Sequence, residues 1–383
     1  MRKNFAIIGV AFISAFVFAE VLLRYYYKPL VKTYPCVEQG HPAYSTKQCP
    51  TSQDRLNSMR FSGDLLYTPQ ASSAGKGWST DSYGFRNNGS LEIMPKQGVT
   101  FKEVRIAVTG GSTAWGVGVM DGQTIPAVLQ KNLAKRCQGI DIVVWNAAIS
   151  AQTSGQERRH FETDILPLRP DIHIAFSGFN DIYNSYTGLL PHQNRDYFEV
   201  GKHFGSEGVG DIIPGLPNLD DYFLRTSYLV SMVYFKLTYD PTRVVEAINR
   251  RAAGTDVTIE SSIRTTRIFS SWAKEYGYDF YYFLQPSIYS TRKQLTSNEE
   301  TIRRSDEEFG KFHSLGYSRL RDRLLLWRGN FVEADFAIAN EKEDLFIDNV
   351  HFGDRGYTLL GESMAAKLIQ TNLILKNNCR VVN

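Results

Sequence analysis

The fold is decided by one short stretch, Val104-Arg-Ile-Ala-Val-Thr-Gly-Gly-Ser-Thr-Ala-Trp-Gly116. Its first six residues are mostly apolar and β-branched, which is typical of a buried strand. Two glycines end that run, Ser112 follows, and a helical pattern begins soon afterwards. A strand that ends in a glycine turn places the serine at the carboxyl edge of a parallel sheet, where open α/β sheets bind their ligands. On this stretch alone, Ser112 is either a nucleophile or part of an ordinary β-to-α turn.

Two better-known glycine motifs are excluded for this stretch. A phosphate-binding loop requires a lysine before its serine or threonine, and residues 110–118 contain no lysine. The nucleophile elbow of the α/β-hydrolases requires a glycine two residues after the serine, and Ala114 stands there instead. A function for Ser112 therefore needs support from the rest of the chain.

The rest of the chain continues an alternation of strands and helices. Apolar patterns predict strands at 104–109, 140–146, 171–177, 279–284 and 330–335, and helices at about 124–136, 155–165, 224–237, 257–276, 299–326 and 356–373. The helix at 299–326 is expected to break near Gly316. Alternation of this kind predicts parallel strands joined by crossover helices.

Three regions are expected along the chain. Residues 101–378 form the main α/β domain, with a loop-rich insertion at 184–223 that is rich in Gly, Pro and Asn. Residues 29–100 form an irregular lead-in whose aromatic residues pack onto that domain. Residues 1–28 form a separate amino-terminal segment.

The amino-terminal segment has the pattern of an export signal. Arg2 and Lys3 precede an apolar run from Phe5 to Ala19, and Glu20 interrupts it before three further apolar residues. Read through Glu20, the run approaches the roughly 20 residues that a bilayer span requires. We therefore expect a single-pass cell-membrane protein whose body is exported to the periplasm or the cell exterior. If the segment is cleaved after its small residues, the protein is secreted.

Composition limits the other partners. The chain has 383 residues, of which 43% are hydrophobic, so a sizeable core is expected. The formal net charge of +3 comes without a dense run of Lys and Arg, and this disfavours a nucleic-acid partner. The sequence leaves the oligomeric state open.

The four cysteines suggest disulfide bonds, because an even number in an exported chain favours pairing. Three pairings are possible, and the most local one joins Cys36 to Cys49 and Cys137 to Cys379. The alternative is four reduced, buried thiols. Neither a CxxC nor an HExxH spacing occurs, so we predict no metal site and no cofactor.

Polar residues follow several of the predicted strands. Besides Ser112, they are the segment Asn146–Ala151, the segment Gly178-Phe-Asn-Asp181, and Asp348-Asn-Val-His351 before the last helix. Because these loops share one edge of a parallel sheet, residues that are distant in sequence can meet there.

Such a set of residues supports acyl transfer. A serine hydroxyl is a poor nucleophile until a base takes its proton, and the imidazole of His351 can be that base. Asp348 stands three residues earlier and can orient the imidazole. The oxyanion that forms needs fixed donors, and the backbone amides of Ser112 and Ala151 with the side-chain amide of Asn180 can supply them.

The four segments, in this order, resemble those of the SGNH (GDSL-type) hydrolases, over about residues 104–370. The resemblance implies a flavodoxin-like three-layer α/β/α sandwich with a five-stranded parallel sheet. It implies Ser112 as nucleophile, His351 and Asp348 as its partners, and Ser112, Ala151 and Asn180 as oxyanion donors. The earlier pattern Trp78…Gly84-Phe-Arg86 resembles that of membrane-anchored members.

Two positions depart from the family pattern. Gly111 replaces the Asp that usually precedes the serine, which is outside the triad. Ala151 replaces the usual glycine of the oxyanion hole, and its methyl group is expected to limit substrate size. Asp181 is expected to be structural and to hold the loop beneath Asn180.

The expected function is an exported serine esterase that hydrolyses an O-acyl ester, most simply an O-acetyl or short-chain ester, of an envelope or extracellular glycan or lipid. One alternative is an O-acyltransferase that uses the same residues on a cell-surface glycan. Another is a catalytically idle envelope protein that only binds a ligand. The sequence leaves the acyl group and the alcohol open.

Overall fold

The computed structural model describes residues 14–19, 43, 59–62, 66–89, 102–186 and 241–380. Most of the predicted anchor at 1–28, most of the insertion at 184–223 and the whole predicted helix at 224–237 lie outside these residues. Within the described ranges, no helix combines the length and apolar character needed to cross a bilayer. Anchoring and export therefore stay predictions.

The centre of the molecule is a five-stranded sheet in which every pair of neighbouring strands is parallel. Its strands are β5 (Lys102–Gly110), β6 (Ile140–Asn146), β7 (Ile172–Ser177), β8 (Asp279–Leu284) and β9 (Asn330–Glu333). They lie in the order β6-β5-β7-β8-β9, which is the flavodoxin-like order 2-1-3-4-5. The predicted sheet is confirmed, and its topological switch point lies between β5 and β7.

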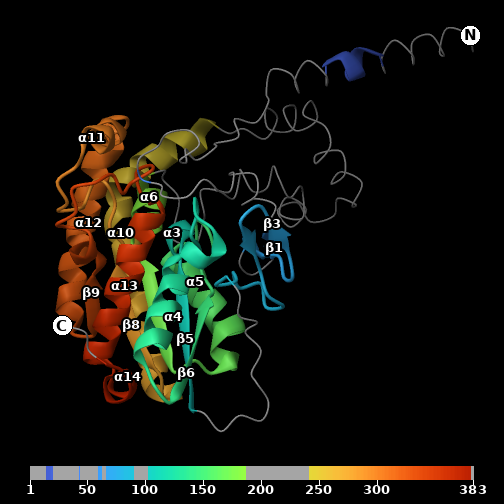
Figure 1. Ribbon diagram of the computed structural model, residues 1–383. Helices are drawn as coiled ribbons and strands as arrows, with labels where there is room; N and C mark the ends of the chain where they lie inside the picture. The colour runs from blue at the N-terminus through green and yellow to red at the C-terminus, as the bar shows by residue number, and fades with distance from the viewer. Residues whose placement is uncertain are drawn as a thin grey trace, which may run out of the picture.

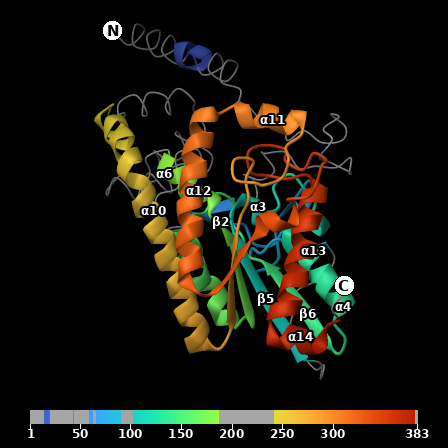
Figure 2. The same ribbon diagram turned by 90° about the vertical axis from the view of Figure 1, so that its left-hand side faces the viewer.

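Helices cover both faces of this sheet (Figures 1 and 2). They are α3 (Ser112–Trp115), α4 (Ile125–Arg136), α5 (Ser154–His160), α6 (Phe179–Tyr186), α10 (Pro241–Tyr276), α11 (Ser297–Arg304), α12 (Glu307–Trp327), α13 (Asp354–Thr371) and α14 (Leu373–Asn378). In Figure 2, α10 and α12 lie on one side of the strands, and α4, α13 and α14 lie on the other. The three-layer α/β/α sandwich predicted from the sequence is therefore confirmed.

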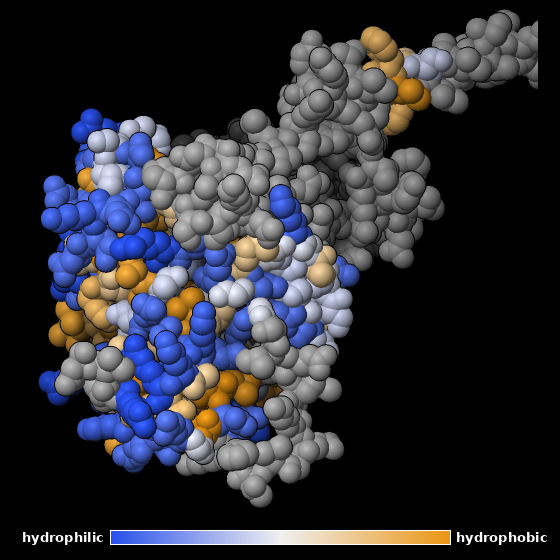
Figure 3. Space-filling model, viewed as in Figure 1, coloured by the Kyte–Doolittle hydropathy of each residue, from blue (hydrophilic) through white to orange (hydrophobic). Residues whose placement is uncertain are grey.

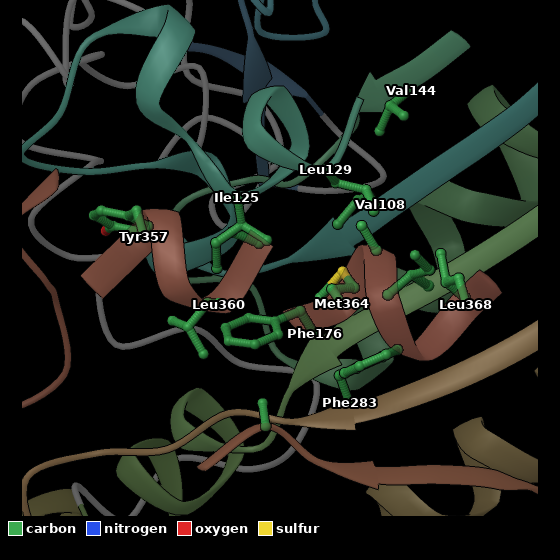
Figure 4. Close-up of a cluster of buried hydrophobic side chains, with 14 of the residues drawn as sticks. Val108, Ile125, Leu129, Val144, Phe176, Phe283, Tyr357, Leu360, Met364 and Leu368 are labelled. Atoms are coloured by element: carbon green, nitrogen blue, oxygen red, sulfur yellow. The ribbon is translucent and has the colours of Figure 1, made fainter. Parts of the chain in front are cut away.

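The alternation of side chains along β5 explains how both faces are filled. Ile106 and Val108 face α4 and α13, in a buried apolar layer that Figure 4 shows with Phe176, Leu360 and neighbouring residues. Ala107, between them, joins the cluster on the opposite face, which includes residues of α10 and α12. Burial of a Val or Ile side chain contributes roughly 1.5–3 kcal/mol, so these two layers hold the sheet in place.

Two helix boundaries follow from capping residues. The α4 helix begins after Thr124, whose hydroxyl accepts a hydrogen bond from the amide of Ala127 at 3.2 Å. The prediction of one helix over 299–326 with a break near Gly316 was wrong. The chain breaks instead between α11 and α12, where Asp306 caps α12 by accepting from the amide of Phe309. Gly316 stays inside α12 because its bare backbone packs against Ile182.

The lead-in contains more regular structure than the sequence suggests. Two antiparallel hairpins are formed by β1 (Met59–Ser62) with β2 (Leu66–Pro69), and by β3 (Ala74–Gly75) with β4 (Trp78–Ser79). Strands this short carry too few residues to show a periodic pattern. Two aromatic residues of this region are buried: Trp78 of β4 is 4% exposed, and Phe85, which follows β4, is 2% exposed.

A disulfide joins Cys137, at the end of α4, to Cys379, just after α14. It is one of the two bonds in the most local pairing, and it ties the carboxyl-terminal tail to the first long helix. Backbone hydrogen bonds reinforce the join, since the amide of Gln138 donates to the carbonyl of Asn378 at 3.1 Å. Cys36 and Cys49 lie outside the described residues.

The surface seen in Figure 3 is mainly hydrophilic over the described domain, with hydrophobic residues in small groups. Scattered exposed apolar residues are ordinary on a globular protein. The apolar residues are otherwise concentrated in the two layers that sandwich the sheet.

The close packing of α13 on α4 gives a first prediction. A Cβ added at Gly361 would lie 2.7 Å from the Cβ of Val128 and 3.0 Å from the carbonyl oxygen of Ile125. Gly361→Ala should therefore push the two helices apart and lower the free energy of unfolding by about 1–3 kcal/mol. Chemical denaturation measures this. Gly122→Ala is the matched control, because nothing lies within 4 Å of the added atom, and an equal loss there would refute the packing explanation.

Candidate active site

Ser112 lies where β5 meets α3, at the switch point of the sheet. Gly110 ends the strand, Gly111 precedes the helix, and Ser112 is its first residue, with 8% of its surface exposed. The amide of Gly116 closes the short helix by donating to the carbonyl of Ser112 at 2.9 Å. Ser112 thus sits at the carboxyl edge of the sheet, as its sequence context predicts.

His351 reaches this serine from the carboxyl-terminal part of the chain. Its Nε2 atom lies 2.6 Å from the Oγ atom of Ser112, across 239 residues of sequence. Its Nδ1 atom lies 2.7 Å from Oδ2 of Asp348. Ser112, His351 and Asp348, predicted from sequence as nucleophile, base and carboxylate, are therefore joined by two consecutive hydrogen bonds.

Asp348 is held in its ionised form by its surroundings. Its Oδ1 accepts hydrogen bonds from the backbone amides of Val350 at 2.9 Å and of His351 at 2.7 Å. Burial raises the pKa of Asp348, but the nearby His351 and these hydrogen bonds outweigh burial and bring it to about 2. The carboxylate can therefore orient the imidazole and stabilise its protonated form over the whole physiological range.

Asn180 lies beside the nucleophile, at the start of α6. Its Nδ2 donates to the carbonyl of Gln152 at 2.9 Å, and the same amide nitrogen packs against Gly111 so closely that a Cβ there would overlap it. A side-chain amide carries two hydrogens, so the hydrogen bond to Gln152 leaves one for a further acceptor. Gly111 thus leaves room for the Asn180 amide, which a larger residue at this position would displace.

Ala151 adopts a left-handed backbone conformation, with φ of 62°. This region is unfavourable for a residue with a Cβ, by roughly 1–2 kcal/mol, and such strain is concentrated at functional sites. The loop that carries it is fixed at both sides, since the amide of Ile149 donates to the carbonyl of Gly110 at 3.0 Å and Asn180 binds Gln152. The three proposed oxyanion donors therefore come from segments that contact one another.

A buried chain of hydrogen bonds, which sequence reasoning missed, links the two halves of the triad. Gln285, just after β8, donates from Nε2 to the hydroxyl of Thr113 at 2.7 Å. That hydroxyl donates to the carbonyl of Val350 at 3.3 Å. Thr113 directly follows Ser112, and Val350 directly precedes His351. These hydrogen bonds therefore constrain the separation of Ser112 and His351. No sequence signal distinguishes these residues from ordinary polar residues of a turn.

The segment that precedes Asp348 is fixed by a buried ion pair. Glu299 accepts from the amides of Leu345 at 2.8 Å and Phe346 at 3.1 Å, and its other oxygen lies 2.5 Å from Nζ of Lys293. Both charged side chains are fully buried. Breaking such a pair leaves an uncompensated buried charge, so the pair holds Glu299 in place. Glu299 in turn fixes the backbone at Leu345 and Phe346, just before Asp348.

Arg86 of the lead-in clamps the turn that follows α3. It is 1% exposed, and its Nη1 donates to the carbonyls of Trp115 at 2.9 Å and Gly116 at 2.7 Å, while Nη2 donates to Val119 at 2.7 Å. Its Nε lies 2.7 Å from Oδ1 of Asp121, which balances the buried charge. Arg86 belongs to the pattern Gly84-Phe-Arg86 noted in the sequence, and these contacts give that arginine a structural role.

Asp181 lies beneath Asn180 and binds the loop of Ala151. It is 2% exposed, and its Oδ1 accepts from the hydroxyl of Ser154 at 2.7 Å. The backbone amide of Ser154 also points at this carboxyl, 3.2 Å from Oδ2. Asp181 therefore connects two of the segments that carry proposed oxyanion donors.

The described part of the chain contains no group of three or more His, Cys, Asp or Glu residues arranged to hold a metal ion. His173, expected in the core, is fully buried and stacks on Phe161 with ring centroids 3.9 Å apart.

Comparisons with known proteins give distant structural likenesses. An acetyl xylan esterase, AlAXEase, is 12% identical, with 70% of this chain and 100% of that chain covered and a TM-score of 0.40. An acetylxylan esterase from Geobacillus stearothermophilus is 13% identical, with 70% and 94% covered and a TM-score of 0.36. A protein described as a putative lipolytic protein of the G-D-S-L family from Desulfitobacterium hafniense is 14% identical, with 68% and 98% covered and a TM-score of 0.34. No family model and no curated protein sequence matches the chain. At these identities and TM-scores, a function has to be inferred from the geometry of the site itself.

The contact between Gly111 and Asn180 gives a second prediction. Gly111 has an ordinary extended conformation, with φ of −88°, so Gly111→Ala is compatible with the backbone and acts only by displacing the Asn180 amide. If that amide stabilises an oxyanion, kcat for ester hydrolysis should fall by ~10²–10³-fold. Steady-state kinetics measures the change, with Gly122→Ala as control. A variant with wild-type kcat would show that the Asn180 amide is no donor.

The hydrogen bonds that connect Gln285, Thr113 and Val350 give a third prediction. Thr113→Val keeps the shape of the side chain but removes the hydroxyl, so the nucleophile and base lose their link and kcat should fall on the order of 10–100-fold. Thr113→Ser keeps the hydroxyl and should stay close to wild type. Equal kcat values for the two variants would contradict a positioning role for this hydroxyl.

Proposed function

We propose that this protein is a serine ester hydrolase with Ser112 as nucleophile, His351 as general base and acid, and Asp348 as the carboxylate that orients the imidazole. The observation that carries the proposal is the unbroken chain from Oγ of Ser112 through the imidazole to Asp348, with links of 2.6 and 2.7 Å. A serine hydroxyl within bonding distance of an oriented imidazole is the arrangement that activates serine for attack on a carbonyl.

In the first half of the proposed reaction, Oγ of Ser112 attacks the ester carbonyl carbon while its proton passes to Nε2 of His351. The carbonyl oxygen becomes an oxyanion, which accepts hydrogen bonds from the amides of Ser112 and Ala151 and from Asn180. The intermediate then collapses, and the C–O bond to the alcohol breaks. The departing alcohol takes the proton from His351, and an acyl group remains on Ser112.

In the second half, water replaces the alcohol. His351 takes a proton from the water as its oxygen attacks the acyl carbon, and the same donors stabilise the second oxyanion. Collapse of this intermediate returns the proton to Ser112 and releases a carboxylic acid. The residues present complete both halves without a metal or cofactor.

The substrate we propose is an O-acyl ester, an O-acetyl or short-chain ester, of an envelope or extracellular glycan or lipid, with residues 1–28 as membrane anchor. Two observations support this finer proposal. The methyl group of Ala151 stands at a donor position where a glycine would leave more room, which favours a small acyl group. The disulfide between Cys137 and Cys379 suits an oxidising, exported location.

The intact triad favours catalysis over a purely binding role. A protein that only binds a ligand has no need to keep a carboxylate ionised against the nitrogen of a histidine that contacts a serine. Hydrolysis and transfer to a glycan hydroxyl share the acyl-enzyme, so the choice between them depends on the acceptor that reaches Ser112.

The proposal predicts that Ser112 carries all of the ester hydrolysis. Full-length protein in detergent should hydrolyse 4-nitrophenyl acetate faster than longer acyl esters. Ser112→Ala should abolish this activity, because it removes the hydroxyl that contacts His351 and forms the acyl-enzyme. Release of 4-nitrophenol gives the rate, and mass spectrometry locates a fluorophosphonate label on Ser112.

Ser305→Ala, at an exposed serine that ends α11, is the control and should keep the wild-type rate. Hydrolysis that persists in Ser112→Ala would refute the proposed function. Adding an acetylated donor with a glycan acceptor, and weighing the products, separates a hydrolase from a transferase.

A further inference from the structure

Two buried carboxyl groups that the proposed reaction does not use lie close to the site. They belong to a set of polar residues that we call the carboxyl cluster, each at most 4% exposed: Thr109, Ser154, Glu157, Ser177 and Asp181. Buried carboxyl groups are costly unless they are bonded, so this cluster requires an explanation.

The cluster touches every segment that carries a proposed oxyanion donor. Thr109 stands three residues before Ser112, Ser154 stands three residues after Ala151, and Ser177 stands three residues before Asn180. Asp181 is the residue directly after Asn180. Each donor segment therefore has its own member in the cluster.

The two carboxyl groups link these members. Asp181 joins α6 to the start of α5 through the hydroxyl and amide of Ser154, at 2.7 and 3.2 Å. Glu157, in the same helix as Ser154, accepts hydrogen bonds from the hydroxyl of Ser177 and, at 3.4 Å, from that of Thr109. The ends of β5 and β7 and the starts of α5 and α6 are thus bonded into one unit.

We propose that Asp181 and Glu157 are positioning residues of this hydrolase, which hold the three donor segments in register through their hydrogen bonds to Ser154, Ser177 and Thr109. The inference rests on the proposed function, because register matters only if the donors stabilise an oxyanion. An oxyanion hole gains its effect from donors that are fixed in advance, and a displacement of about 1 Å can cost about 10²-fold in rate.

The surroundings raise the pKa values of both carboxyl groups, but to different extents. Burial, together with the charge of Asp181, raises the pKa of Glu157 to about 8, although the hydrogen bonds from Ser177 and Thr109 lower it. Burial raises the pKa of Asp181 to about 6, against the hydrogen bonds from Ser154. Near pH 7 Asp181 is therefore ionised, as its two donors require, while Glu157 is protonated.

Among the described residues, the other titratable groups that face the pair supply no positive charge. His173 of β7 lies 3.0 Å from the hydroxyl of Thr109, and burial holds its pKa well below the usual value, so it is neutral. Tyr282 of β8 is buried, and burial together with the two carboxyl groups raises its pKa well above the usual value. Tyr317 of α12, beyond Tyr282, also has a raised pKa because of burial, and from α10 the neutral hydroxyl of Ser262 faces Asp181.

A pH dependence follows from these directions. The pKa of Glu157 is about 8 in the folded protein and about 4.3 in an unfolded chain, so its contribution to stability is present below about pH 4.3 and is lost as pH rises through 8. Above pH 8 two neighbouring buried carboxylates repel each other, and the donor segments lose their register. We therefore expect kcat to decline above pH 8 while KM changes little.

The test compares near-isosteric variants of the full-length protein. Asp181→Asn leaves Ser154 without one acceptor and should lower kcat about 10- to 100-fold with little change in KM. Glu157→Gln mimics the protonated acid, so it should keep kcat at pH 7 and abolish the decline above pH 8. Initial rates of 4-nitrophenyl acetate hydrolysis across this pH range, with melting temperatures, give both results.

Asp335→Asn is the matched control. Asp335 is equally buried, at 2% exposed, but it binds Thr291 and Arg292 rather than a donor segment. It should lower the melting temperature without lowering kcat. A drop in kcat for Asp335→Asn as large as that for Asp181→Asn would make the effect a general loss of structure and overturn the inference.

The remaining outcomes are decisive as well. Asp181→Asn with wild-type kcat and a lowered melting temperature would reduce the cluster to a structural role. An unchanged alkaline decline in Glu157→Gln would refute the positioning role of Glu157. If Asp181→Asn fails to fold, Ser154→Ala decides, since the inference requires a lower kcat at an unchanged melting temperature. A wild-type protein that neither hydrolyses esters nor takes a fluorophosphonate label would end the proposed function itself.

Discussion

The site depends on one contact, the 2.6 Å approach of Nε2 of His351 to Oγ of Ser112. The two residues are 239 positions apart, so no local structure can create this contact, and it forms only when the tertiary fold brings their loops together. Its tolerance is small, because misplacement by about 1 Å can cost about 10²-fold in rate. A second hydrogen bond supports this contact. The hydroxyl of Thr113, next to Ser112, donates to the carbonyl of Val350, next to His351. Packing of the two apolar layers places the loops of Ser112 and His351 near each other, and hydrogen bonds then fix their exact positions.

The carboxyl-terminal helices and the lead-in also position the site, the helices by apolar packing and the lead-in by hydrogen bonds. The layer between α4 and α13 and the sheet fixes where β5 ends, and therefore where Ser112 lies. Arg86 then fixes the turn after α3 through carbonyl oxygens that α3 itself leaves without helical partners. Tyr67 of β2 adds a bond of 2.6 Å to the carbonyl of Ser150, next to the strained Ala151. Segments that look peripheral in the sequence thus determine the geometry of loops at the centre of the site.

The sequence predicted what depends on local pattern. All five strands were placed to within a few residues, because buried parallel strands such as β8 are nearly continuous apolar runs. The break in the 299–326 region was misplaced, because glycine at 316 suggested a break that packing against Ile182 overrides, while the cap at Asp306 was overlooked. Ser112, His351 and Asp348 were predicted to meet from residue type, order and the family resemblance, and each lies within hydrogen-bonding distance of the next. Thr113 and Glu157 were not assigned roles, because their partners are distant in sequence and a glutamate in a helical pattern ordinarily faces solvent.

The two faces of the sheet differ in a way that stability alone does not explain. Against α4 and α13 the strands present an apolar layer, as in Val108 and Phe176. Against α5 and α10 the same strands bury His173 and Ser177, and α5 adds Glu157. Burial of a carboxyl group raises its pKa and weakens folding as pH increases, so an apolar residue of similar volume would be more stable there. Glu157 bonds to Thr109 and Ser177 near the carboxyl ends of β5 and β7, next to the segments that carry the proposed oxyanion donors, so its burial is explained if it fixes the geometry of those segments.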